Sequence, residues 1–320
     1  MNFAVMFPGQ GSQKIGMGLD LFEKFDAARE LFKKADEIIG REILKIIFYG
    51  PDNDLNQTKN TQPAIFLISV LLMLLLQEEL KKKKLDFKPK ACCGHSLGEF
   101  SALWFAGFLS FEDLLKLVSL RGELMQNAPK GAMAAVLNLS SKKIDEMIKQ
   151  ENLSGKIVIA NYNSPVQYVI SGEKNAVELF LPKIKLTGGK VILLPVSGAF
   201  HSTLMSEPSR IFSLEVDKLN PKSSGEIPIF QNYDGNPSIN FSEIKEKIKK
   251  QMTSSVLWTQ TINSLSKSGI DSVLEIGPGK ILTGLVKKIN PGIKTYNIFD
   301  YQSLIEFVTL CESDLMIFKS

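Results

Sequence analysis

The sequence predicts an α/β protein in which a small domain is inserted into a larger domain built around a parallel sheet. Three short apolar segments, Phe3–Phe7, Ala91–Gly94 and residues 273–276, each run into a turn that contains glycine. This is the pattern of buried strands that end in tight loops. The middle of the chain shows a different order of elements, that of a split βαββαβ unit.

The N-terminal part is predicted to be mostly helical after its first strand. Residues 19–47 carry apolar side chains at helical spacing. Thr61 is placed to cap the next helix, with Pro63 in its first turn, where a missing N–H costs nothing. The apolar run at 64–76 falls short of the ~20 residues that a bilayer requires, so we expect a buried core helix and no membrane association.

The small domain is predicted between Gly131 and Gly198, which bracket the change of pattern. Its strands are expected at 132–139, 156–161, 167–171 and 190–196, and its helices at 141–151 and 174–186. We therefore divide the chain into a ferredoxin-like domain at residues 130–198 and a large domain formed by residues 1–129 and 199–320.

The composition indicates a globular cytoplasmic protein. The 38 lysines and arginines exceed the 34 aspartates and glutamates by too little to indicate a nucleic-acid partner. Cys92, Cys93 and Cys311 give no disulfide framework, and reduced thiols are typical of the cytoplasm. The N-terminal sequence MNFAVMFPGQG lacks the positively charged start of a secretory signal.

Residues 94–98, Gly-His-Ser-Leu-Gly, match the Gly-x-Ser-x-Gly nucleophile elbow. An apolar strand precedes the motif and a helix follows it, so the first N–H groups of that helix can stabilise an oxyanion beside Ser96. The alternative is a plain glycine turn, but the strand–turn–helix context favours a nucleophile.

A serine nucleophile needs a base, and the chain contains two histidines, His95 and His201. His95 adjoins Ser96, so its side chain is expected to point the other way and to serve packing or hydrogen bonding. His201 is therefore the candidate base, although a lone histidine is more often structural. Because it lies in mid-chain, unlike the late histidine of standard esterases, we expect a dyad whose second imidazole nitrogen is held by a backbone carbonyl or an amide side chain.

Along nearly its whole length the chain resembles malonyl-CoA:acyl carrier protein transacylases of type II fatty acid synthesis and the acyltransferase domains of modular synthases. The matching segments are FPGQGSQ (7–13), TQPAIF (61–66), GHSLGEFSAL (94–103), RGELM (121–125), NYNSPVQYVISG (161–172), PVSGAFHS (195–202) and EIGPGKILTGL (275–285). With the elbow, this resemblance indicates an α/β-hydrolase-like large domain with a ferredoxin-like insertion.

The resemblance also assigns the residues that would carry the reaction. It makes Ser96 the acylated nucleophile and His201 the base, in agreement with the reasoning from the residues alone. It places the oxyanion hole at the backbone N–H groups of Gln10 and Leu97. It gives the base an orienting main-chain carbonyl at Leu257, where family members usually carry glutamine.

Further positions would bind the substrate. Read alone, Arg121 is a solvated helical arginine, but the resemblance makes it a clamp for a malonyl carboxylate, which a guanidinium fork fits with two parallel hydrogen bonds. Phe200 would crowd a branched acyl group, and Asn161 and Asn163 would shape the pocket, unless they are simply turn residues. Lys190 stands where relatives tend to have arginine and could meet phosphates of coenzyme A or of the carrier's arm.

The resemblance thus implies ping-pong transfer of a malonyl group from malonyl-CoA to the phosphopantetheine arm of acyl carrier protein. No metal and no cofactor is signalled. We expect a monomer, although no feature of the sequence indicates the oligomeric state. We expect the carrier protein to dock near Lys190, Lys287 and Lys288. A hydrolase with the same serine and histidine, and a silent carrier-binding subunit, are the alternatives.

Overall fold

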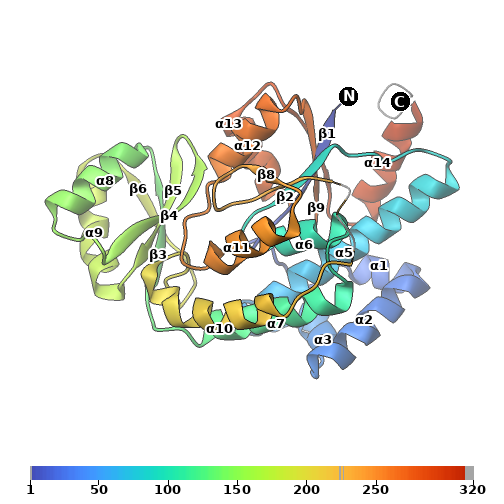
Figure 1. Cartoon of the computed structure of the whole chain (residues 1–320), viewed down its shortest axis with the longest axis horizontal. Coiled ribbons are helices and arrows are strands. Elements are labelled where there is room, and N and C mark those ends of the chain that lie inside the picture. Colours follow the sequence, from blue (N-terminus) through green and yellow to red (C-terminus); the bar gives the residue numbers. More distant parts are fainter. Residues whose placement is uncertain (1, 223–224, 226, 314–320) are drawn as a thin grey trace.

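A six-stranded sheet forms the centre of the large part of the molecule (Figure 1). The computed structural model describes residues 2–222, 225 and 227–313. The strand order is β10-β9-β1-β2-β7-β8, parallel except for the short edge strand β8, which pairs antiparallel with β7. The strands are β1 (Phe3–Phe7), β2 (Ala91–Gly94), β7 (Ile229–Phe230), β8 (Pro237–Ser238), β9 (Ser272–Ile276) and β10 (Lys294–Ile298).

Alternation along β1 shows how helices cover both faces of this sheet. Val5 and Phe7 face the main core, which contains the long helix α5 (Thr58–Lys82). Ala4 and Met6 face the second core, formed mainly by α12 (Trp258–Lys267) and α13 (Ile281–Ile289). Since β1 is buried on both faces, it reads as an unbroken apolar run rather than as an alternating one.

The other helices of the large part lie around these two cores. They are α1 (Leu19–Lys24), α2 (Asp26–Ile39), α3 (Ile43–Tyr49), α4 (Asp52–Leu55), α6 (Gly98–Phe105), α7 (Phe111–Gln126), the 3₁₀ helix η1 (Thr203–Met205), α10 (Ser206–Asp217), α11 (Phe241–Gln251) and α14 (Tyr301–Ser313).

The second sheet lies at one end of the long axis of the molecule (Figure 1). It is antiparallel, in the order β4-β5-β3-β6, which is the strand order of a ferredoxin-like βαββαβ unit. Its elements are β3 (Ala132–Leu137), α8 (Ser141–Gln150), β4 (Ile157–Ser164), β5 (Gln167–Gly172), α9 (Lys174–Leu186) and β6 (Lys190–Leu193). The predicted α/β fold class is confirmed.

The two faces of this small sheet serve different cores. One face packs on α8 and α9 around Ile144, Ile170 and Phe180. On the other face, Met133 and Ala135 belong to the main core of the large part. Lys130 and Gly198 pair where the chain enters and leaves the small sheet. The domain boundaries at 130 and 198 stay a prediction.

The helical pattern predicted over residues 19–47 is divided among three helices: α1, α2, which ends at Ile39 before Gly40, whose φ of 74° only glycine adopts readily, and α3. One local prediction is wrong. Thr61 does not cap α5, which begins three residues earlier, at Thr58. Its hydroxyl instead donates to the carbonyl of Leu55, 2.5 Å away. Pro63 therefore lies in the second turn.

The surroundings of Pro63 show how an interior proline is tolerated. It cannot donate to the carbonyl of Lys59, four residues before it. The Nη2 of Arg41 donates to this carbonyl at 2.6 Å. The acceptor that proline leaves free is thus satisfied from a neighbouring segment, and α5 continues to Lys82.

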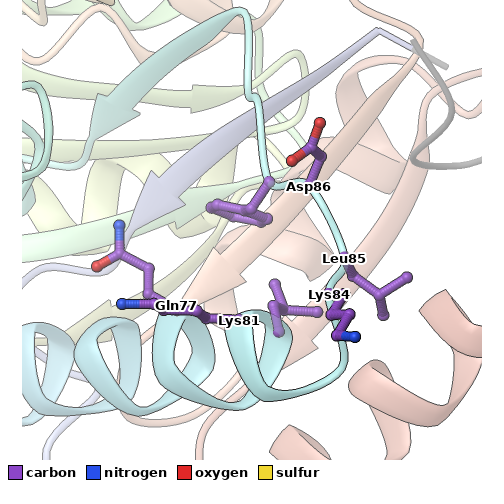
Figure 2. A pocket seen from close by; sticks show the side chains of 7 residues that line it. Gln77, Lys81, Lys84, Leu85 and Asp86 are labelled. Atoms are coloured by element: carbon purple, nitrogen blue, oxygen red, sulfur yellow. The ribbon is translucent and has the colours of Figure 1, made fainter.

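By length and composition α5 could cross a membrane, but 78% of its most apolar 18-residue window is buried inside the protein. Near its C-terminal end, Gln77 and Lys81 line a hollow together with Lys84, Leu85 and Asp86 of the following segment (Figure 2). This hollow shares no residue with the cavity at Ser96 described below. Lys82 pairs with Glu78 at 2.9 Å, so this basic run is partly neutralised.

Candidate active site

Ser96 lies at a sharp turn between β2 and α6, with a φ of 51° in the left-handed region. The turn needs both flanking glycines. A Cβ on Gly98 would lie 2.0 Å from the carbonyl oxygen of Phe7, and one on Gly94 would lie 1.9 Å from the backbone of Gly98. The conformation is held by Asn232, whose Oδ1 accepts from the Ser96 N–H at 2.6 Å and whose Nδ2 donates to the Gly94 carbonyl at 2.7 Å.

The imidazole of His201 reaches the serine hydroxyl. Its Nε2 lies 2.9 Å from Ser96 Oγ, and its Nδ1 lies 3.0 Å from the Gln251 carbonyl and 3.1 Å from the Ser254 carbonyl. Since carbonyl oxygens only accept, the proton is assigned to Nδ1, which leaves Nε2 free to accept the serine proton. The second nitrogen is thus held by backbone carbonyls.

The surroundings of His201 keep its ring neutral in the free protein. Burial, reinforced by the positive charge of Arg121, lowers its pKa to about 3. The Gln251 carbonyl that it meets ends helix α11 and carries the partial negative charge of that terminus. This carbonyl therefore favours the imidazolium that forms once a proton is taken from serine.

The prediction that Leu257 orients the base is wrong. The carbonyl of Leu257 accepts from the hydroxyl of Thr261 at 3.0 Å, because it already belongs to the first turn of α12. The carbonyls that point at His201 lie at the end of α11 and in the turn after it. The presence of leucine instead of glutamine at position 257 therefore costs His201 none of its hydrogen bonds.

Arg121 is fully buried on α7 and points toward the serine. Its Nη2 donates to Ser96 Oγ at 3.1 Å and to Gln251 Oε1 at 2.9 Å, and its Nη1 donates to Gln62 Oε1 at 2.8 Å. Its Nε has no partner within the described chain. All its hydrogen-bond acceptors are neutral, so a substrate carboxylate beside Ser96 would supply the negatively charged partner that the guanidinium lacks.

Two backbone amides are available for an oxyanion. Within the described residues, the N–H groups of Gln10 and Leu97 donate to no protein acceptor. Both residues line the cavity that contains Ser96. The amide of Ser96 itself is taken by Asn232, which leaves the next amide, that of Leu97, to act.

The cavity has a volume of about 270 Å³ and lies between the elbow and the inner face of the small sheet. Phe200, Asn161 and Asn163 line it, and their contact with substrate stays a prediction. The Oδ1 of Asn163 lies 2.8 Å from His95 Nε2, so His95 serves hydrogen bonding as predicted. The expectation that it points away from Ser96 is wrong, because His95 lines the same cavity. Lys190 is exposed on β6 and does not line the cavity; its role stays a prediction.

Sequence reasoning missed the residues that hold this site together. Gln62, Glu99, Asn232 and Gln251 are all buried polar side chains that contact a predicted site residue or one another. Two of them could have been singled out by their position in the sequence: Gln62 lies in the segment TQPAIF, and Glu99 directly follows the elbow. Gln251 lies in an ordinary lysine-rich helix and gave no signal.

Fold and site together define an α/β protein with a serine–histidine pair and a buried arginine in one pocket. Residues 5–298 match the acyl transferase domain family, and the chain belongs to this family. The chain is 39% identical over 306 residues to the malonyl CoA-acyl carrier protein transacylase of Bacillus subtilis, covering 94% of each chain. It is 38% identical to the enzyme of that name from Synechocystis, covering 93% of this chain and 97% of that protein.

Solved structures agree with these relatives. The crystal structure of malonyl CoA-acyl carrier protein transacylase from Clostridium perfringens superposes with a TM-score of 0.89 at 36% identity and covers 99% of both chains. A malonyl-transacylase in complex with a type II polyketide acyl-carrier protein gives a TM-score of 0.90 at 33% identity over 97% of this chain and 100% of that chain. The chain is an acyltransferase.

Proposed function

We propose that this protein moves a malonyl group from malonyl-CoA to the phosphopantetheine thiol of acyl carrier protein through an ester on Ser96, and so supplies fatty acid synthesis. The observation that carries the proposal is the 2.9 Å contact between Ser96 Oγ and His201 Nε2, beside the buried guanidinium of Arg121. Its relatives' names point to the same substrate and acceptor.

In the first half-reaction, His201 Nε2 takes the proton of Ser96 as Oγ attacks the thioester carbonyl. The amides of Gln10 and Leu97 donate to the oxyanion of the tetrahedral intermediate. The C–S bond then breaks, and the leaving coenzyme A thiolate receives the proton from the imidazolium. Malonyl-Ser96 and free coenzyme A remain.

The second half-reaction runs through the same groups in reverse order. The pantetheine thiol enters the space that coenzyme A has left and gives its proton to His201. Its sulfur attacks the ester carbonyl, a second oxyanion forms at the same amides, and the C–O bond to Ser96 breaks. The serine oxygen recovers its proton from the imidazolium, which regenerates the free enzyme.

Arg121 selects the acyl group in this scheme. A malonyl carboxylate replaces neutral acceptors with a charged one at a guanidinium that is shielded from water. Charge-assisted bidentate hydrogen bonds of this kind are among the strongest in proteins. Phe200, buried at the cavity wall, restricts branching at the carbon between the two carbonyl groups.

The carrier protein would approach over helix α13. Ile281 at its start lines the cavity, and exposed Lys288 near its end contacts Gln167, another lining residue, at 3.3 Å. Lys287 and Lys288 could therefore steer an acidic carrier toward the cavity mouth. Replacing both by glutamate should slow transfer to the carrier at low salt while leaving self-acylation by malonyl-CoA unchanged; equal transfer rates would exclude this docking face.

We further propose that the enzyme works in the cytoplasm as a monomer without a membrane partner. Its three cysteines are buried free thiols, and its apolar helix α5 is enclosed by the core. Light scattering of the purified protein should give the mass of one chain. A dimer mass at micromolar concentration would contradict the proposed oligomeric state.

The experiment that tests the proposed function follows the fate of the malonyl group. The protein is mixed with labelled malonyl-CoA, with or without holo acyl carrier protein, and label on carrier, label on enzyme and free malonate are counted. A transferase moves label to the carrier and releases little malonate without it. Rapid malonate release independent of the carrier would show a hydrolase, and no label on the enzyme would indicate a silent carrier-binding subunit.

A further inference from the structure

Glu99, in the first turn of α6, is a buried carboxyl without an ion-pair partner in the described chain. Its side chain is 2% exposed. It accepts two hydrogen bonds, from the backbone N–H of Asn232 at 2.7 Å and from the side-chain Nε2 of Gln251. Burying a carboxyl against neutral donors costs free energy, so packing alone does not account for Glu99.

Its contact with Gln251 fixes which way that carboxamide points. A carboxylate only accepts, so the amide nitrogen of Gln251 must face Glu99. The same nitrogen also donates to the Ser96 carbonyl at 3.0 Å. The amide oxygen is then directed at Arg121, whose Nη2 it meets at 2.9 Å. If the carboxamide flipped, it would present N–H groups to a guanidinium that cannot accept them.

Gln251 consequently joins all the reacting groups. Its side chain bridges Glu99 to Arg121, and its main-chain carbonyl accepts a hydrogen bond from the Nδ1–H of His201. Arg121 in turn donates to Ser96 Oγ. A change at Glu99 therefore reaches the guanidinium through a single intervening side chain.

Charge balance gives Glu99 a second effect on Arg121. No carboxylate lies within ion-pair distance of the guanidinium in the described residues, and burial lowers the pKa of Arg121 to about 10. Glu99 is the group whose charge opposes that shift. Burial raises the pKa of Glu99 to about 7, Arg121 counteracts the rise, and Asp234 adds to it. The two buried charges thus compensate each other through the carboxamide between them.

We propose that Glu99 is a positioning residue for acyl-group selection, which holds the Gln251 carboxamide and the Arg121 guanidinium in the arrangement that receives a dicarboxylic acyl group. This inference rests on the proposed function, since it concerns selection at the same site. Glu99 touches neither the substrate nor the reacting atoms and acts through Gln251.

The test compares self-acylation rates with malonyl-CoA and acetyl-CoA in Glu99→Gln. Glutamine keeps the shape but loses the charge and one acceptor, so the malonyl-to-acetyl rate ratio should fall about ten- to a hundred-fold, as expected for hydrogen bonds to charged groups. The matched control is Glu275→Gln. Glu275 is also fully buried but accepts from the N-terminal amides of α13, so its loss should lower stability and leave the ratio unchanged.

A double-mutant cycle separates positioning from mere support of the fold. In an Arg121→Ala background, Glu99→Gln should have no further effect on the ratio, because the guanidinium that it positions is gone. An unchanged ratio in the single variant, or independent effects in the double variant, would overturn the inference.

If Glu99→Gln fails to fold, Gln251→Met removes the bridge and keeps the main-chain carbonyl at His201; the same fall in ratio is expected, and an unchanged ratio again overturns the inference. Wild-type protein that forms no malonyl ester would overturn the proposed function itself, a result distinct from an ester that forms without selectivity.

Discussion

Replacing Arg121 by alanine should abolish the preference for a dicarboxylic acyl group while sparing the serine–histidine pair. The guanidinium is fully buried and donates to Gln62, Gln251 and Ser96, so alanine leaves two amide oxygens without a donor and a bound carboxylate without a counter-charge. Truncating one partner of a buried charged pair costs about 2–5 kcal/mol. We therefore expect kcat/KM for malonyl-CoA to fall roughly 30-fold to several thousand-fold.

The assay measures kcat/KM for self-acylation with malonyl-CoA and with acetyl-CoA. Acetyl-CoA has no carboxylate, so its rate should change far less. Arg121→Lys is the matched control, because lysine keeps the charge and loses the planar fork; it should recover part of the malonyl rate. An alanine variant that loses both substrates equally would refute the reasoning, since Arg121 would then support the dyad rather than the acyl group.

Two further predictions concern the base and the elbow. His201 has a folded-state pKa of about 3 against 6.5 for an exposed imidazole, so between these values the unfolded chain binds the extra proton and stability falls on acidification. Between pH 6 and pH 4 the free energy of unfolding, measured with denaturant, should fall by on the order of 2 kcal/mol less in His201→Gln than in wild type. Parallel curves of unfolding free energy against pH for the two proteins would show that His201 has an ordinary pKa. Gly98→Ala places a Cβ 2.0 Å from the Phe7 carbonyl oxygen, so this variant should unfold at a lower temperature and lose acylation. The control Gly284→Ala, which has open space around the added Cβ, should show neither effect. Acylation of Gly98→Ala at the wild-type rate would contradict the elbow geometry.

The opposing titration of Glu99 does not disturb the comparison at His201. Its folded pKa of about 7 lies above its ordinary value of 4.5, so it favours the folded state as pH falls through that window. Wild type and His201→Gln share this contribution, and it cancels in their difference. The remaining difference reports the imidazole.

Sequence reasoning succeeded where chemistry depends on neighbours along the chain. The elbow could be predicted because strand, glycines and helix are contiguous around Ser96. His201 followed because the chain contains only one other histidine. The α/β fold followed from short apolar strands and a change in element order. Arg121 could be singled out only by resemblance, since a helical arginine is usually solvated.

The errors and omissions have one physical cause, which is the spatial arrangement of distant segments. The carbonyl that orients His201 depends on where α11 ends and α12 begins, so position 257 was wrong by several residues. Glu99 and Gln251 meet across 152 positions in sequence. Thr61 has a good capping side chain, but α5 starts earlier, and the Thr61 hydroxyl donates to the carbonyl of Leu55 at the end of α4.

Intact-mass analysis of the protein after brief incubation with malonyl-CoA tests the central claim most directly. Wild type should gain one malonyl group, peptide mapping should place it on Ser96, and added holo acyl carrier protein should remove it. Ser96→Ala should gain nothing. A malonyl group that persists in Ser96→Ala, or that maps to another residue, would contradict the account.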